Sequence, residues 1–255
     1  MTIHDFGQAL LADLYNSPYT GGLDNDTPIV FLAHSMGGLV IKKVLILAKQ
    51  DPSYHKMAAR SHSMIFLATP HRGSDSASLL RNILQLSGAY GSKAHLENLV
   101  PNSEAIYAIH DQFRHIHQDV QLWSFFETVK TPIGLIVEKD SAILGLPGER
   151  IQLLNADHRQ VCKFDDPSDS NYRTLRNAFG AVISSIESTW FSTRREEHQT
   201  DMKKLSDFLG YVERPDADLS MLSDHQIVRV SPNESPSFVM DNDIDKLLSI
   251  INILK

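Results

Sequence analysis

Residues 28–38 of the chain read PIVFLAHSMGG, and they carry the strongest indication of the fold. Its first six residues form a continuous apolar run, preceded by a segment rich in Gly, Pro, Asn and Asp. Such a run predicts a strand that is buried on both faces of a parallel sheet. His34 and Ser35 follow the run, Met36, Gly37 and Gly38 come next, and residues 39–50 read as a helix with several apolar positions. The stretch therefore predicts a strand, a sharp turn that carries a serine, and a helix.

The same alternation continues along the chain. Apolar runs predict further strands, and segments with helical spacing of apolar residues predict helices between them. Alternating strands and helices with short loops are typical of an α/β fold with a mostly parallel sheet and helices on both of its faces. The expected strands are residues 63–68, 120–126 and 133–137, and the expected helices are residues 3–15, 76–86, 103–117 and 171–190.

The turn at Ser35 matches the pattern G-x-S-x-G, in which a strained strand-to-helix turn presents a nucleophilic serine. The flanking residues must be small, because the turn brings the strand and helix backbones close together. Here Ala33 stands in place of the first glycine, and Gly37 is the second. The bare pattern is common by chance, but its position between a buried strand and a helix is specific. We therefore expect a nucleophile elbow with Ser35 as the nucleophile.

Several motifs resemble those of a known family. The segments HSMGGLVIK (34–42) and FLATPHRGS (66–74) look like the paired motifs of lipase-like α/β hydrolases. The segments SFFET (124–128), DSAILG (140–145) and DH (157–158) with CKF (162–164) narrow the resemblance to the serine-active-site, or SERAC-like, branch.

Within that branch the chain most resembles the lipase-like domains at the N-termini of fungal NACHT or NB-ARC signalling proteins, from about residue 3 to residue 186. Residues 204–224 are similar, more weakly, to the linker before the nucleotide-binding module of such proteins. The resemblance implies a serine esterase, with lipid esters among its substrates.

A serine hydroxyl needs a base to take its proton, and an acid to orient that base. In this fold the chain order is serine, acid, histidine. His158 fits the base by its order and by the resemblance. Glu127, at the end of the third expected strand, is the favoured acid, because this fold places the acid one strand before the histidine. Asp140 is the main alternative, and two further possibilities stay open, Glu138 or no acid at all.

Acyl transfer also needs hydrogen-bond donors for the developing oxyanion. The backbone N–H of Met36 is one expected donor. The second normally comes from a His-Gly loop upstream of the elbow, and the 34 residues before Ser35 contain no such loop. We therefore expect an N-terminally truncated, partial hydrolase fold that lacks its early strands. Its elbow strand would be an exposed sheet edge that fits a protein partner.

Two functions follow. The first is a serine hydrolase acting on ester bonds. The second is a non-catalytic signalling or interaction domain that derives from a lipase-like hydrolase and lacks a complete oxyanion hole. Residues 1–190 are expected to form the hydrolase domain. Residues 191–255 are expected to form a linker-like tail that is helical in part or disordered.

The bulk properties exclude several other classes. The chain has 255 residues and a net charge of -7, so its overall charge does not attract the negatively charged backbone of nucleic acid. No apolar run is long enough for a transmembrane helix, and a cytoplasmic location is expected. The single cysteine, Cys162, excludes an internal disulfide and a cysteine cluster for zinc. We expect no cofactor and no metal. His110, His115 and His117 are interpreted as a solvated helix face, and His71 as part of a structural turn near the site.

Overall fold

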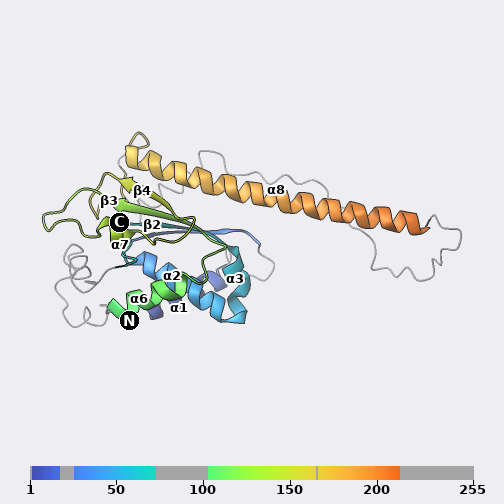
Figure 1. The fold of residues 1–255 in the computed structure, drawn as a ribbon, viewed down its shortest axis with the longest axis horizontal. Helices are drawn as coiled ribbons and strands as arrows, with labels where there is room; N and C mark the ends of the chain where they lie inside the picture. Colours follow the sequence, from blue (N-terminus) through green and yellow to red (C-terminus); the bar gives the residue numbers. More distant parts are fainter. Residues whose placement is uncertain (1, 18–25, 73–102, 165, 213–255) are drawn as a thin grey trace.

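The computed structural model describes residues 2–17, 26–72, 103–164 and 166–212. Its sheet has four parallel strands in the spatial order β1–β2–β3–β4, with helices on both faces (Figure 1). This is the α/β fold with a parallel sheet that the sequence predicts. The strands are β1 (Ile29–His34), β2 (Ser61–Leu67), β3 (Gln121–Glu127) and β4 (Arg150–Leu154).

The helices connect the strands and cover the sheet. On one face lie α1 (Ile3–Asn16), α2 (Gly37–Gln50) and α6 (Ser103–Phe113), and α2 packs against both of the others. The short helices η1 (Pro52–Tyr54) and α3 (His55–Arg60) lead into β2, and α7 (Lys139–Ala142) lies between β3 and β4. On the opposite face lies the first part of the long helix α8 (Ser170–Val212), which then extends away from the sheet (Figure 1).

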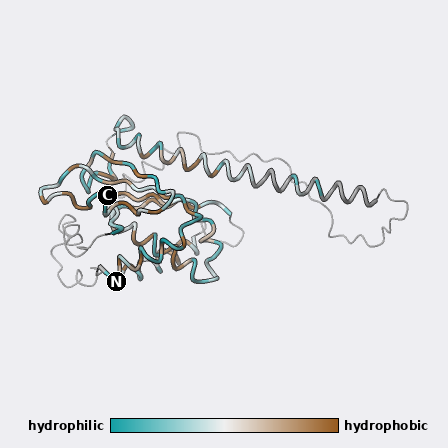
Figure 2. Tube along the Cα trace, in the orientation of Figure 1, coloured by the Kyte–Doolittle hydropathy of each residue, from teal (hydrophilic) through white to brown (hydrophobic). Residues whose placement is uncertain are grey.

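Two hydrophobic clusters join the sheet to these helices. One contains Phe31, Met64 and Phe66 together with buried residues of α1, α2 and α6. The other contains Leu67 and Phe125 together with buried residues of α8 between positions 172 and 182. Both faces of β2 are therefore buried, as expected for a strand inside a parallel sheet. Figure 2 shows the hydrophobic residues gathered along the strands and the helices next to them.

One of the expected strands is wrong. Residues 133–137 form no strand, and the only pairing nearby is an isolated bridge between Thr131 and Gly134. The fourth strand is instead β4, which the sequence pattern did not reveal. β4 lies at an edge of the sheet, and Ile151 and Leu153 are 44% and 55% exposed. Polar residues interrupt its apolar ones, so β4 lacks the continuous apolar run that marks a central strand.

Three further expectations concern a second helix after β2, the C-terminal tail and the domain boundary at residue 190. The helix expected over residues 76–86, and the tail beyond residue 212, lie outside the described residues. Helix α8 continues without a break through residue 190, the expected end of the hydrolase domain. In the part of the chain that is described, β1 and β4 are the two edges of the sheet.

Candidate active site

Ser35 lies on a strained turn between β1 and α2. Its φ angle is +52°, a left-handed conformation that costs a residue other than glycine about 1–3 kcal/mol. Backbone hydrogen bonds on both sides hold it there. Ser35 N–H donates to the Leu67 carbonyl at 2.9 Å, and Gly38 N–H donates to the Ser35 carbonyl at 3.1 Å. The turn therefore has the backbone geometry expected of a nucleophile elbow.

The two glycines after Ser35 face different surroundings. A Cβ placed on Gly37 would lie 3.7 Å from Ala33 Cβ, which is an ordinary contact. A Cβ placed on Gly38 would lie 2.8 Å from Thr69 Cβ and even closer to Thr69 Oγ1. The close approach that demands glycine is thus between the first turn of α2 and the end of β2, and it falls on Gly38.

Three side chains from the ends of β1, β3 and β4 meet in one row. His158 lies four residues after the end of β4, and its Nε2 is 2.9 Å from Ser35 Oγ. On the other side of the ring, His158 Nδ1 is 2.7 Å from Glu127 Oε2. Since a carboxylate only accepts, Nδ1 carries the proton and Nε2 is free to accept the Ser35 hydroxyl. Ser35, His158 and Glu127 are 7%, 3% and 1% exposed.

The carboxylate of Glu127 has further hydrogen bonds that fix its orientation. Its Oε1 accepts from the backbone N–H of Ile136 at 2.5 Å and of Val137 at 3.1 Å. A buried carboxylate is tolerated when such donors compensate for its lost water. The apolar segment that we expected to be a strand therefore wraps around the carboxylate of Glu127 and supplies two donors to it.

The alternative acids lie elsewhere. Asp140 is in the first turn of α7 and is exposed, and Glu138, at the N-cap of α7, is exposed as well. The position next to His158 Nδ1 is taken by Glu127. Of the acids considered from the sequence, the structure brings Glu127 to the histidine.

Met36, the expected oxyanion donor, is the N-cap residue of α2. The first N–H groups of a helix have no partner within the helix, and they lie at the positive end of the helix dipole. The N-terminus of α2 therefore places backbone donors and a partial positive charge next to Ser35.

The loop that carries His158 is tied down at a further point that the sequence did not reveal. His34, the last residue of β1, approaches the carbonyl oxygen of His158 with its Nε2 at 2.8 Å. The two imidazole rings are 4.9 Å apart. Burial lowers the pKa of His34 to about 4, with the nearby His158 contributing to the shift, so His34 is neutral near pH 7. The sequence did show a histidine at the end of an apolar strand, which could have marked His34 as a residue to consider.

A group of basic side chains lies behind the elbow, between α2, α6 and the end of β2. Lys42 and His71 are fully buried, and their side-chain nitrogens have no hydrogen-bond partner in the part of the chain that is described. Burial lowers the pKa of Lys42 to about 7. Burial first, and then the charge of Lys42, lower the pKa of His71 well below its usual value. The same causes lower the pKa of His110 to about 4.

The residues His71 and Arg72 form a structural connection. The backbone N–H of His71 donates to the Ser141 carbonyl at 2.8 Å, and Arg72 Nε donates to the Ile143 carbonyl at 3.0 Å. The Ser141 hydroxyl donates in turn to the Arg72 carbonyl. These bonds join the end of β2 to α7 and the segment after it, as the interpretation of a structural turn predicts.

The interpretation of three histidines as one solvated helix face needs correction. Helix α6 ends at Phe113, so His115 and His117 lie beyond it. His117 is buried, stacks on the Phe113 ring with centroids 6.0 Å apart, and donates from Nδ1 to the Arg114 carbonyl at 2.9 Å. Aromatic stacking on the helix end removes this side chain from solvent.

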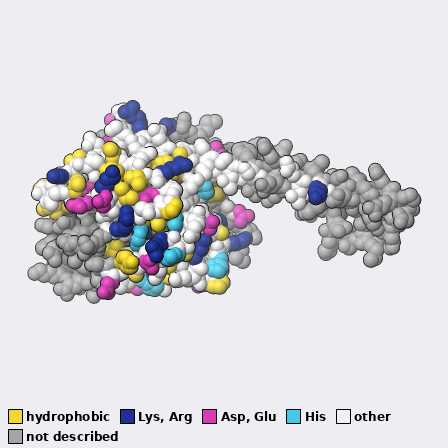
Figure 3. Space-filling view, in the orientation of Figure 1, with side chains coloured by type: hydrophobic (Ala, Val, Ile, Leu, Met, Phe, Trp, Pro, Cys, Tyr) yellow, Lys and Arg dark blue, Asp and Glu magenta, His cyan; other side chains and the backbone are white. Residues whose placement is uncertain are grey.

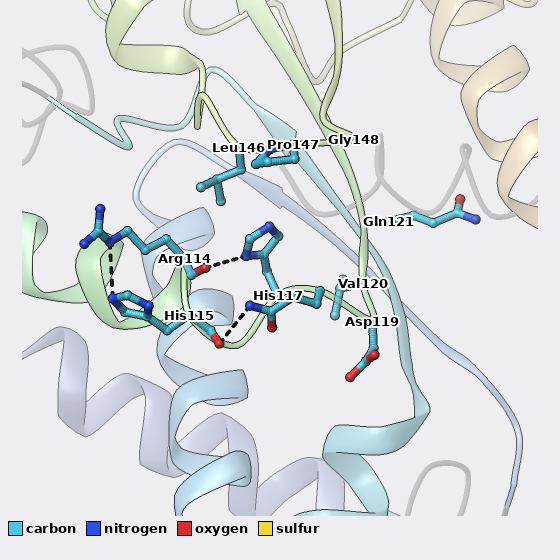
Figure 4. A pocket seen from close by; sticks show the side chains of 10 residues that line it. Arg114, His115, His117, Asp119, Val120, Gln121, Leu146, Pro147 and Gly148 are labelled. Carbon is cyan, nitrogen blue, oxygen red and sulfur yellow. Dashed lines mark hydrogen bonds between the residues drawn. The ribbon is translucent and has the colours of Figure 1, made fainter.

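His117 also lines a pocket of about 740 Å³, together with Arg114, His115 and residues 118–121 and 146–148 (Figure 4). The pocket contains Gln121, the first residue of β3, whereas Glu127 is the last residue of the same strand. The two ends of a strand of this length are about 20 Å apart. The pocket therefore lies at the opposite end of the sheet from Ser35 and His158.

No group of three metal-ligating side chains is found among the described residues. The described helices also include none with the length and apolarity needed to cross a bilayer. On the face drawn in Figure 3, basic and acidic side chains are intermingled, with no continuous basic patch.

No protein-family model matches the chain, but several known proteins are similar to part of it. Protein SERAC1 of Bos taurus is 34% identical over 170 residues, which cover 64% of this chain and 25% of the bovine protein. Protein SERAC1 of Homo sapiens is 32% identical over 170 residues, with the same coverage. Protein SERAC1 of Danio rerio is 32% identical over 159 residues, which cover 59% of this chain and 23% of that protein.

This similarity to SERAC1 supports the relationship to lipase-like α/β hydrolases that the motifs indicate. The chain spans about a quarter of the length of these curated relatives. A lipase-esterase related protein from Clostridium acetobutylicum superposes with a TM-score of 0.43 and 13% identity, over 71% of this chain and 75% of that one. The fungal signalling context and the truncation expected from the sequence stay predictions.

Proposed function

We propose that this domain is a serine hydrolase that cleaves ester bonds through Ser35, His158 and Glu127. The observation that carries the proposal is the continuous hydrogen-bonded row from Ser35 to His158 to Glu127. Ser35 Oγ is 2.9 Å from His158 Nε2, and His158 Nδ1 is 2.7 Å from Glu127 Oε2. These lie within the reach required of a nucleophile and its base. The left-handed turn at Ser35 and the N-terminus of α2 next to it add support.

The reaction would proceed in two balanced halves. Ser35 Oγ attacks the ester carbonyl carbon while His158 Nε2 accepts the hydroxyl proton. The resulting imidazolium is stabilised by Glu127, and it donates its proton to the leaving alcohol oxygen as the carbon–oxygen bond breaks. Water then attacks the acyl carbon while His158 Nε2 accepts its proton; the bond from that carbon to Ser35 Oγ breaks, His158 returns the proton to Oγ, and the carboxylic acid leaves. The developing oxyanion would be stabilised by the Met36 N–H and the helix dipole.

The decisive test is covalent labelling of the folded protein with a fluorophosphonate probe, which reacts with an activated serine. We expect the wild type to be labelled, and Ser35→Ala and His158→Ala to lose labelling. Ser192→Ala, an exposed serine on α8, is the matched control and should be labelled at the wild-type rate. A folded wild-type protein that resists the probe would overturn the proposal.

The identity of the acid can be tested in the same assay. Glu127→Gln keeps the side-chain shape but removes the charge that stabilises the imidazolium, so labelling should slow by about 10²–10⁴-fold. Asp140→Asn makes the same chemical change at the alternative acid and should leave the rate unchanged. Slow labelling of Asp140→Asn, with normal labelling of Glu127→Gln, would assign the acid to Asp140 instead.

The alternative is an interaction domain derived from such a hydrolase. It is favoured by the position of β1, which carries the elbow and lies at an edge of the sheet among the described residues. Edge strands offer backbone groups to a partner. If the folded wild type resists the probe, association measured by light scattering with and without a candidate partner becomes the relevant experiment.

A further inference from the structure

The histidine next to the nucleophile has a second connection to the active site. His34 precedes Ser35 directly and ends β1, while its ring reaches across to the loop after β4. The His158 carbonyl oxygen can only accept a hydrogen bond, so His34 Nε2 must be the donor in their 2.8 Å contact. Because burial lowers the pKa of His34 to about 4, the donor at neutral pH is the neutral imidazole with its proton on Nε2.

Other hydrogen bonds shape the His158 loop and join it to the end of β3, where the Ala156 carbonyl accepts from Thr128 N–H at 3.2 Å and from Val129 N–H at 3.1 Å. Asp157 stabilises the turn locally, since its Oδ1 accepts from Arg159 N–H at 2.8 Å and from Gln160 N–H at 3.0 Å. Those bonds fix the shape of the turn, but they do not fix its position relative to β1. The contact from His34 does so, because it joins the backbone of residue 158 to the residue that precedes the nucleophile.

We propose that His34 is a positioning residue that holds the backbone of His158 in place through its Nε2–H bond, and so keeps His158 Nε2 within reach of Ser35. The inference rests on the proposed hydrolase function, in which His34 touches neither the substrate nor the reacting atoms. The distance from Ser35 Oγ to His158 Nε2 depends on two chain segments that are 123 residues apart in sequence. The bond from His34 joins these two segments directly, next to the nucleophile.

The test compares variants that keep or remove the donor. His34→Gln places an amide N–H near the position of Nε2 and cannot be protonated, whereas His34→Leu and His34→Phe keep apolar bulk without a donor. A misplacement of about 1 Å can cost about 10²-fold in rate. We therefore expect fluorophosphonate labelling of the His34→Leu and His34→Phe variants to slow by about 10- to 100-fold. His34→Gln should stay within about threefold of wild type. All are compared after circular dichroism and thermal melting confirm folding.

A second measurement does not depend on turnover. The proton on His158 Nδ1, hydrogen-bonded to Glu127, should give a downfield proton NMR signal in the wild type. We expect the signal to persist in His34→Gln and to broaden or vanish in the donorless variants. In steady-state assays with a chromogenic ester, the donorless variants should lose kcat with little change in KM, because His34 is not placed at the substrate.

Each outcome has a defined meaning. Wild-type labelling rates in both donorless variants would refute the inference, and so would equal losses in Gln, Leu and Phe, because the ring would then act by its shape alone. If the wild type itself is not labelled, the proposed function fails and the NMR signal alone decides. A signal kept in Leu and Phe refutes the positioning role, and a signal lost there but kept in Gln supports it.

Discussion

Replacing Lys42 by methionine should stabilise the fold at neutral pH. The lysine side chain is fully buried on α2, and its Nζ has no hydrogen-bond partner among the described residues. Within the described part of the chain, its ammonium makes a cation–π approach of 5.8 Å to the Phe113 ring. The nearby residues His71 and His110 are neutral at pH 7, because burial lowers their pKa values, so neither supplies a counter-charge.

The size of the effect follows from the pKa of Lys42, which burial lowers from 10.5 to about 7. Between these values the unfolded chain binds a proton that the folded chain has released. The free energy of unfolding therefore rises with pH across the window from 7 to 10.5 and is reduced below it. At pH 7 this reduction is about 4 kcal/mol. Loss of the cation–π contact offsets about 0.5–2 kcal/mol of the gain. We thus expect Lys42→Met to be about 2–4 kcal/mol more stable at pH 7.

Urea denaturation of the wild type and of Lys42→Met at several pH values from 7 to 10 measures this difference in the free energy of unfolding. The gain should shrink as the pH approaches 10, because the wild-type lysine is then neutral in the folded chain and the unfolded chain, with a pKa of 10.5, is close to losing its proton as well. Lys43→Met, the same change at the next, only partly buried position of α2, should have a smaller effect. A Lys42→Met protein that is less stable than wild type at pH 7, or that keeps the wild-type pH dependence, would refute the reasoning and indicate that the ammonium has a partner.

Three further outcomes are expected. Gly38→Ala should lower the free energy of unfolding by at least about 1–3 kcal/mol because its Cβ meets Thr69, whereas Gly37→Ala has room and should be nearly neutral in the same denaturation assay. His71 stays neutral when the unfolded chain protonates, so wild-type stability should fall as the pH drops below 6.5, by up to about 1.4 kcal/mol per pH unit for this residue. His71→Phe should lose that part of the slope, and an unchanged slope would contradict the assignment. Glu127→Ala should leave Ile136 and Val137 N–H without their acceptor, so their amide hydrogens should exchange faster; unchanged exchange would argue against that contact.

The sequence predicted the strand, turn and helix around Ser35 well because the signal is local. A buried strand, Ser35 and a helix follow one another within residues 28–50, and β1 and α2 lie where they were expected. The choice of Glu127 over Asp140 also agrees with the observed contact to His158, since the order of strands in this fold constrains which acid can reach the histidine. Whether these groups act as a catalytic triad stays a prediction.

The failures arise where tertiary contacts decide. Residues 133–137 have the composition of a strand, but their N–H groups serve the Glu127 carboxylate instead of a neighbouring strand. The edge strand β4 is half exposed and lacks a clear pattern. The role of His34 depends on a residue 124 positions away, and the burial of Lys42 runs against the usual exposure of lysine. No local pattern contains that information.

Ser35 is not the only residue with a left-handed backbone at this end of the sheet. Ala68, which directly follows β2, has a φ angle of +44° and is fully buried, and its N–H donates to the Phe125 carbonyl at 2.7 Å. Two adjacent strands thus end in conformations that favour glycine. At Ser35 the unfavourable conformation cannot be separated from the nucleophile, whereas at Ala68 the side chain is a methyl group with no proposed chemical role. A change of Ala68 to glycine would therefore remove the unfavourable backbone conformation at the end of β2 and leave the proposed nucleophile unchanged, which is a route open to selection for thermal stability.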